Sequence, residues 1–133
     1  MGIYVASQLI KTMKQKSIKI KNAKILIMGL TFKENCADIR NSGITSTIKK
    51  LKQFKCNLDL YDPWADSNEI KDLYNIGSVN SLKRNTYDGI IISVAHDKFK
   101  DMGIKSINAL GKKTFVLYDL KHIFLKQETD LRL

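Results

Sequence analysis

Gly89-Ile-Ile-Ile-Ser-Val-Ala95 is the stretch of sequence that decides the fold. It is a continuous apolar block with β-branched residues and no helical period, and the polar pair His96-Asp97 follows it. A short apolar run of this kind is typical of a strand that is buried on both faces of a parallel sheet. We therefore predict a strand at 89–95 in the centre of such a sheet.

Strands and helices are expected to alternate over the rest of the chain. Apolar blocks or alternating patterns before turn residues predict further strands at Lys24–Gly29, Cys56–Pro63 and Thr114–Asp119. Apolar residues at helical spacing predict helices over 3–13, 44–54, 67–76 and 104–110. This alternation predicts an α/β fold, a Rossmann-like doubly wound parallel sheet with helices on both faces and right-handed crossovers.

Three of the helices carry expectations about single residues. The apolar face of the first helix is expected to consist of Ile3, Ala6, Ile10 and Met13. In the helix at 67–76 we expect Ser67 or Asn68 as the N-cap and Gly77 as the end. Gly111 is expected to end the helix at 104–110.

The domain organisation follows from length and from the start of the first helix. The chain has 133 residues, and single domains commonly have about 100 to 150. No linker rich in Pro, Gly or Ser divides residues 17–133. The first helix begins with no N-cap residue before it, as a helix does when it continues from an upstream segment. We therefore expect residues 1–16 to be the end of a longer helix and residues 17–133 to form one domain.

Composition excludes several classes of protein. No apolar run approaches the roughly 20 residues that span a bilayer, and the N-terminus lacks the features of a signal peptide. Cys36 and Cys56 do not form a Cys-x-x-Cys pair and are too few for a disulfide framework. The sequence therefore predicts a cytoplasmic protein with no membrane partner and no metal site.

The formal net charge of +10 has two opposed interpretations. It is either a general field that attracts nucleic acid or membranes, or part of a site for a polyanionic small ligand. Many of the lysines are spread over the first 55 residues, without an interleaved aromatic platform of the kind that single-strand binders use. We therefore expect no nucleic-acid partner, and a lysine-rich overall composition would also produce this charge.

The turn Gly29–Arg40 is the longest and most polar of those expected at the carboxyl ends of the strands, where doubly wound sheets bind ligands. Lys33, Arg40 and the start of the following helix suit phosphate groups. The alternative is that Asp38 pairs with Arg40 or caps that helix, while Lys33 is merely solvated. The turn lacks two glycines of the G-x-G-x-x-G fingerprint, and the chain has no P-loop.

Four ordered motifs carry a resemblance to a known family. They are Gly29-x-x-Phe32-Lys33-Glu34-x-x-x-Asp38-x-Arg40-x-Ser42, Tyr61-Asp62-Pro63, Tyr87-Asp88-Gly-Ile-Ile-Ile-Ser-Val-Ala-His96 and Tyr118-Asp119-Leu120-Lys121. Over nearly its whole length the chain resembles the UDP-glucose/GDP-mannose dehydrogenase family. Within this family, the sequence of the motifs is most similar to that of the UDP-N-acetylhexosamine 6-dehydrogenases, which make aminosugar uronates for capsule and O-antigen.

The resemblance implies a three-part enzyme with an N-terminal NAD domain, a central helix that carries much of the dimer contact, and a C-terminal UDP-sugar domain. Residues 1–16 would end the central helix, and 17–133 would form the C-terminal domain. Such enzymes oxidise C6 of the sugar from alcohol to carboxylate in two NAD-dependent steps. The family's catalytic cysteine lies upstream in a G-x-C-x-x-x-D context, which neither Cys36 nor Cys56 has. The resemblance thus implies no catalytic residue here and no activity of this chain alone.

The motifs also imply binding roles for four residues. Phe32 and Lys33 match family positions that line the bound UDP-sugar. Lys121 falls where related enzymes have a basic residue near the nucleotide-sugar, usually an arginine in UDP-glucose dehydrogenases. Arg40 matches an arginine that reaches across the interdomain cleft toward NAD. The implied partners are a UDP-sugar, the N-terminal half of the same enzyme, which binds most of the NAD, and a second copy in a homodimer.

A different class of function stays open, namely a non-catalytic module for nucleotide binding or oligomerisation. Three further residues have structural interpretations. His96 is expected to cap or support a loop, because it has no evident paired carboxylate. Trp64 is expected to be a packing residue at a loop or dimer surface. Asp62 is expected to serve the turn after its strand rather than to bind a ribose.

Overall fold

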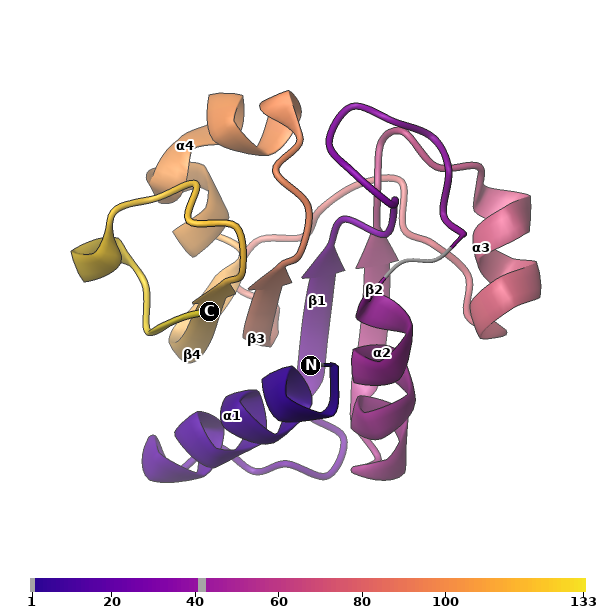
Figure 1. The fold of residues 1–133 in the computed structure, drawn as a ribbon. Coiled ribbons are helices and arrows are strands. Elements are labelled where there is room, and N and C mark those ends of the chain that lie inside the picture. The colour runs from indigo at the N-terminus through magenta and orange to yellow at the C-terminus, as the bar shows by residue number, and fades with distance from the viewer. Residues whose placement is uncertain (1, 41–42) are drawn as a thin grey trace.

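A computed structural model describes residues 2–40 and 43–133 (Figure 1). In these residues five strands form one parallel sheet in the order β2-β1-β3-β4-β5. The strands are β1 (Lys24–Met28), β2 (Asn57–Tyr61), β3 (Tyr87–Ile92), β4 (Gly111–Asp119) and β5 (Leu131–Arg132). The helices are α1 (Gly2–Gln15), α2 (Ile44–Gln53), α3 (Ser67–Tyr74), α4 (Asp97–Asn108) and the 3-10 turn η1 (Lys126–Glu128). The Rossmann-like parallel sheet and its central strand β3 are confirmed.

The order of the strands fixes where a ligand site can form. From β1 the chain passes through α2 to β2 on one side, and it then returns to place β3 on the other side of β1. The loops after β1 and β3 therefore leave the sheet in different directions. In open α/β sheets, ligands bind in the crevice that this reversal creates at the carboxyl ends of the strands. In Figure 1 these ends are the arrowheads, and the loop after β1 rises above them.

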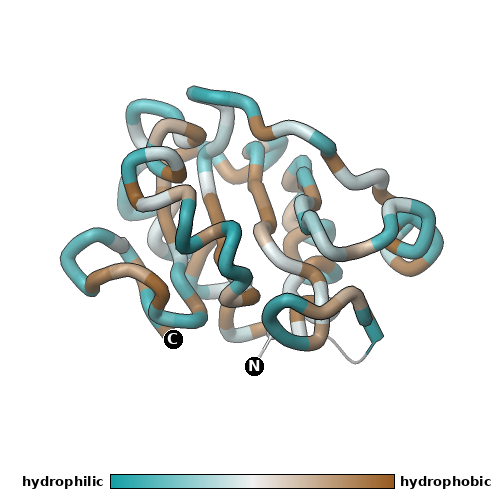
Figure 2. Tube along the Cα trace, turned by 90° about the horizontal axis from the view of Figure 1, so that it is seen from above, coloured by the Kyte–Doolittle hydropathy of each residue, from teal (hydrophilic) through white to brown (hydrophobic). Residues whose placement is uncertain are grey.

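Two apolar layers hold the helices on the sheet. Alternate residues of β1 point to opposite faces, as in any strand. Ile25 and Ile27 belong to the layer under α1 and α2, whereas Leu26 and Met28 belong to the layer that includes Phe99 and other residues of α4. Figure 2 shows the brown strand segments in the middle of the molecule and teal segments around them. Helices therefore cover both faces, as the sequence predicts.

The buried face of α1 differs in part from its prediction. Ala6, Ile10 and Met13 are buried as expected, but Ile3 is 60% exposed. The core positions also include Val5 and Leu9, so Ile3 lies at the edge of the buried stripe in the first turn. Because α1 contributes to the same core as the sheet, it is packed as part of this fold. The division between residues 1–16 and 17–133 stays a prediction.

The ends of α3 correct the expected capping residues. Asp66, rather than Ser67 or Asn68, is the N-cap, and its carboxylate accepts the backbone N–H of Glu69 at 3.3 Å. The helix ends at Asn75, which has a left-handed φ of 56°, so Gly77 does not end it. Asparagine adopts this conformation more readily than most residues because its short side chain bonds to nearby backbone groups.

The start of α4 and the last strand were not predicted. The helix begins at Asp97, well before residue 104, and Gly103 interrupts it with a φ of 79°. This break removes the continuous apolar period, so only the second half is recognisable in the sequence. Gly111 opens β4 instead of ending the helix. None of the helices in the described ranges combines the length and hydropathy needed to cross a membrane.

Candidate functional site

A cavity of about 180 Å³ opens at the carboxyl edge of the sheet. Its walls come from the loops after β1, β3 and β4, with Phe32, Ser93 and Lys121 among the lining residues. The first residues of α1 and α2 close another side, since Gly2 and Ile44 also line the cavity. The structure therefore brings together Phe32 and Lys121, two of the residues that the sequence predicts for the substrate, although they are far apart in the chain.

Gly29 lets the loop after β1 leave the sheet close to β3. Its φ of 105° lies in the region that favours glycine. A Cβ atom at this position would lie 2.7 Å from Cβ of Val94, which is too close for any side chain. The Ser93 hydroxyl donates to the Gly29 carbonyl and adds a tie between the two loops. Any side chain at position 29 would force the loops apart.

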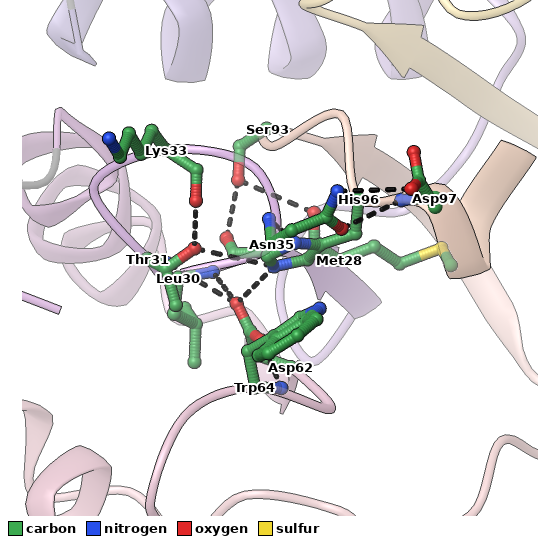
Figure 3. Close-up of polar contacts among 11 residues, drawn as sticks. Met28, Leu30, Thr31, Lys33, Asn35, Asp62, Trp64, Ser93, His96 and Asp97 are labelled. Carbon is green, nitrogen blue, oxygen red and sulfur yellow. Dashed lines mark hydrogen bonds and ion pairs between the residues drawn. The ribbon is translucent and has the colours of Figure 1, made fainter. Parts of the chain in front are cut away.

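Asp62 holds the beginning of this loop from the carboxyl end of β2. Its Oδ2 accepts the backbone N–H groups of Leu30 at 2.7 Å and Thr31 at 3.2 Å. Its Oδ1 accepts the N–H of Trp64 at 2.8 Å (Figure 3). The carboxylate is buried and occupied by these donors. Asp62 serves turn structure, as expected, and leaves little capacity for a ribose.

His96 is the second buried polar residue at this edge. Its ring is fully buried, and Nε2 lies 3.0 Å from Oδ2 of Asp62. The expectation that His96 lacks a paired carboxylate is therefore wrong. The two residues are 34 positions apart and lie in the loops after β2 and β3, which are not neighbours in the sheet, so local spacing gave no signal of the contact. The supporting role expected for His96 fits its position.

Opposing effects act on the Asp62 carboxyl. Burial alone would raise its pKa, because an apolar environment disfavours the charged form. Hydrogen bonds from His96 and from the backbone N–H groups of Leu30 and Trp64 stabilise the carboxylate more strongly, so the pKa of Asp62 is lowered from its ordinary value. The charged carboxylate is therefore the form that the folded loop requires.

Lys121 is held at the cavity by an analogous turn after β4. The carboxylate of Asp119, which is fully buried, accepts the backbone N–H of Lys121 at 3.2 Å and that of Phe124 at 2.9 Å. The Lys121 side chain is exposed. A fixed backbone with an exposed ammonium group suits an anionic ligand, because lysine acts as a mobile point charge.

Lys33 follows Phe32 in the loop, but its side chain is outside the set that lines the cavity. The Thr31 hydroxyl donates to the Lys33 carbonyl at 2.9 Å, which fixes the backbone. The exposed side chain extends away from the buried polar groups in Figure 3. Thr31 and Asn35, which sequence reasoning did not single out, supply contacts that shape this turn.

Arg40 lies apart from these residues. Its Nε and Nη2 atoms donate to the two carboxylate oxygens of Asp38 at 3.0 and 3.1 Å, and the Arg40 side chain is 84% exposed. The bond from Arg40 lowers the pKa of Asp38. Both residues line a separate hollow of about 720 Å³ beside Leu73 of α3. The structure thus shows the ion pair that the sequence left as an alternative, while Ser42 of the same motif lies outside the described residues.

Neither a metal-binding cluster nor an activated Cys56 thiol is found among the described residues. The described residues contain no group of three or more His, Cys, Asp or Glu side chains arranged to hold a metal ion. Cys56 is buried, and desolvation, with a smaller effect of Asp88, raises its pKa to about 11. A thiol of this kind is mostly protonated at neutral pH and is a poor nucleophile. The cavity itself combines the exposed ring of Phe32 with the side chain of Lys121.

Comparison with known proteins identifies the family of this chain. Residues 26–126 match the model of the UDP-glucose/GDP-mannose dehydrogenase family, UDP binding domain. The chain belongs to the UDP-glucose/GDP-mannose dehydrogenase family. All of it aligns with UDP-N-acetyl-D-glucosamine 6-dehydrogenases of Salmonella typhi, at 45% identity, and Pseudomonas aeruginosa, at 44%. It spans only 31% and 32% of their lengths, so these dehydrogenases are about three times as long.

Solved structures of dehydrogenases show the same fold. A UDP-D-ManNAc dehydrogenase from Pyrococcus horikoshii superimposes with a TM-score of 0.73 at 23% identity, over 93% of this chain and 28% of that one. An NDP-N-acetyl-D-galactosaminuronic acid dehydrogenase from Methanosarcina mazei gives a TM-score of 0.76 at 16% identity, over 95% and 26%. At these identities the likeness concerns the fold alone.

Proposed function

We propose that this chain is the UDP-sugar-binding part of an NAD-dependent UDP-N-acetylhexosamine 6-dehydrogenase. The enzyme would oxidise C6 of the sugar from alcohol to carboxylate for capsule or O-antigen synthesis. UDP-N-acetyl-D-glucosamine is the favoured substrate, because the relatives that act on it by name are 44 and 45% identical to this chain. A relative named UDP-N-acetyl-D-mannosamine dehydrogenase, from Methanococcus aeolicus, is 31% identical.

One observation carries the binding part of the proposal. An exposed aromatic ring and a lysine, Phe32 and Lys121, line one cavity at the carboxyl edge of the sheet. Phe32 is 60% exposed although it is a large apolar residue. Such a ring offers a surface for the base or the sugar of a nucleotide-sugar, and the ammonium groups of Lys121 and Lys33 offer charge for the diphosphate.

The remaining parts of the reaction are assigned to the portion of the relatives that this chain does not span. That portion would supply the catalytic cysteine and most of the NAD contacts. Arg40 would turn from Asp38 toward the cofactor when the two domains close, since its exposed side chain is held by an ion pair at the surface, and such pairs contribute little. The enzyme would act as a homodimer.

Titration calorimetry with UDP tests the binding part. The chain should bind UDP, and Lys33→Ala and Lys121→Ala should each weaken binding about tenfold, because a hydrogen bond to a charged group contributes about 1.5 kcal/mol or more. Lys21→Ala is the matched control. Lys21 is an exposed lysine in the loop before β1, at the opposite edge of the sheet, and its loss should leave the affinity unchanged. Unchanged affinity in both site variants would contradict the assignment.

Activity requires a separate experiment on the complete open reading frame. The full-length protein should reduce NAD with UDP-N-acetyl-D-glucosamine, and the present chain alone should not. A complete frame that encodes neither a dinucleotide fingerprint nor a G-x-C-x-x-x-D segment would favour the alternative. The chain would then be a non-catalytic module for nucleotide binding or oligomerisation. UDP binding by the chain is compatible with both outcomes, so the two experiments address different parts of the proposal.

A further inference from the structure

His96 contacts the loop after β1 at several points without being accessible to a ligand. The ring is fully buried, and Nδ1 accepts the backbone N–H of Asn35 at 2.9 Å. On the other side of the ring, Nε2 lies 3.0 Å from Oδ2 of Asp62 and 3.3 Å from Oγ1 of Thr31. Figure 3 shows these contacts reaching the ring from the loops after β1 and β2.

These contacts determine which nitrogen of His96 carries the hydrogen. A backbone N–H is only a donor, so Nδ1 must be the unprotonated acceptor and Nε2 must carry the hydrogen. That hydrogen points to the Asp62 carboxylate, with the Thr31 oxygen as a second acceptor. The Thr31 hydroxyl then donates its own hydrogen to the Lys33 carbonyl. The neutral Nε2–H ring therefore fixes the backbone on both sides of residue 34.

Asn35 adds a second connection between the same two loops. It has a left-handed φ of 55°. Its Oδ1 accepts the backbone N–H of Asp97 at 3.2 Å, and its Nδ2 donates to the Asp97 carboxylate at 3.1 Å. Asp97 is the first residue of α4, so the loop after β1 caps this helix from outside. Contacts to His96 and to Asp97 therefore shape the turn 31–35.

We propose that His96 is a positioning residue for nucleotide-sugar binding, which holds the turn 31–35 so that Phe32 and Lys33 face the ligand. The proposal rests on the proposed function, because it assigns the ligand of Phe32 and Lys33. His96 itself does not touch the ligand. Its effect reaches the site through the Asn35 amide and through the bridge from Thr31 to the Lys33 carbonyl.

The surroundings of the ring offer variants that separate packing from hydrogen bonding. The His96 ring lies edge-on to Phe99, with centroids 5.2 Å apart, and 6.3 Å from the Trp64 ring. His96→Phe keeps an aromatic ring there and removes both nitrogen contacts. His96→Asn keeps an acceptor near the place of Nδ1, whereas His96→Gln keeps a donor near the place of Nε2 and loses that acceptor.

Amide hydrogen exchange without ligand tests the structural half. The Asn35 amide should exchange about tenfold faster in His96→Phe than in the wild type, because local opening no longer breaks a hydrogen bond. His96→Asn should retain most of the protection, and His96→Gln should lose it. The comparison of Asn with Gln decides the question even if the phenylalanine variant fails to fold. Equal Asn35 exchange in all folded variants would overturn the proposal.

A double-mutant cycle on UDP affinity tests the functional half. His96→Phe alone should weaken UDP binding about tenfold. In the Lys33→Ala background it should add only about threefold, the part that acts through Phe32, because coupled residues are not additive. Fully additive losses would indicate a general structural role and overturn the positioning role. Failure of the wild-type chain to bind UDP would instead overturn the proposed function, while the exchange experiment would still decide how the turn is held.

Discussion

The two halves of the loop after β1 are held in different ways. Residues 29–35 are tied to the rest of the domain by hydrogen bonds that involve the fully buried side chain of His96 and the buried carboxylate of Asp62. Residues 36–40 end in an ion pair between Asp38 and Arg40 that is open to solvent. Burial strengthens polar contacts and makes their loss costly, whereas water screens exposed pairs. The first half is thus held by buried polar contacts. In the second half Ile39 is packed in the core and the Asp38 carbonyl accepts the N–H of Phe32, so the exposed Arg40 side chain is the part that can change partners most easily.

This contrast suits the proposed roles of the two halves. A residue that binds the substrate before the chemical step benefits from a fixed backbone, because the ordering cost is already met in the free protein. A residue that reaches a cofactor on another domain needs freedom to move when the domains close. Phe32 and Lys33 lie in the first half, and Arg40 ends the second.

Separate alanine substitutions of Asp62 and Asp38 should show the largest difference between the two halves of the loop. Asp62→Ala should lower the free energy of unfolding by about 3 kcal/mol, because it leaves His96 and three backbone N–H groups without their buried acceptor. Asp38→Ala should leave the free energy of unfolding within experimental error, since its partner Arg40 stays in water. Chemical denaturation of both variants beside the wild type measures the difference. Similar losses in the two variants would refute the assignment of a rigid and an adaptable half.

The pH dependence of stability should show a smaller effect of the buried Asp62 carboxylate. The folded protein lowers the pKa of Asp62, so this residue contributes stability above its unfolded pKa, about 3.9 for an ordinary aspartate. That contribution is lost as the pH falls through the lower folded pKa. The difference in unfolding free energy between wild type and Asp62→Asn should therefore be constant near neutral pH and shrink below about pH 4. A difference that is independent of pH would show that the buried charge adds no stability.

The sheet and the cavity differ in how far the sequence could predict them. The strand around Ile90–Ile92 was recognisable because a short β-branched run with no helical period has few other solutions. The two-residue strand β5 was not recognisable, because it is too short to carry a pattern. Residues 97–103 of α4 were missed because the left-handed Gly103 interrupts the helical period.

The sequence also predicted only part of the candidate site. The motif identified Phe32 and Lys121, which the fold brings to one cavity. It gave no sign that Asp62 and His96 would meet, because their contact depends on the order of three strands and not on spacing along the chain. The binding roles of Phe32, Lys33, Lys121 and Arg40 stay predictions.

Chemical-shift mapping of the amide signals during a UDP titration tests the central claim most directly. UDP should shift the amides of Phe32, Lys33, Ser93 and Lys121 at the cavity and leave those of Ala37 to Arg40 nearly unchanged, since NAD and the domain that binds it are absent from the titration. Shifts confined to the hollow beside Arg40 and Leu73, or no saturable shifts at all, would contradict the placement of a UDP-sugar at the carboxyl edge of the sheet.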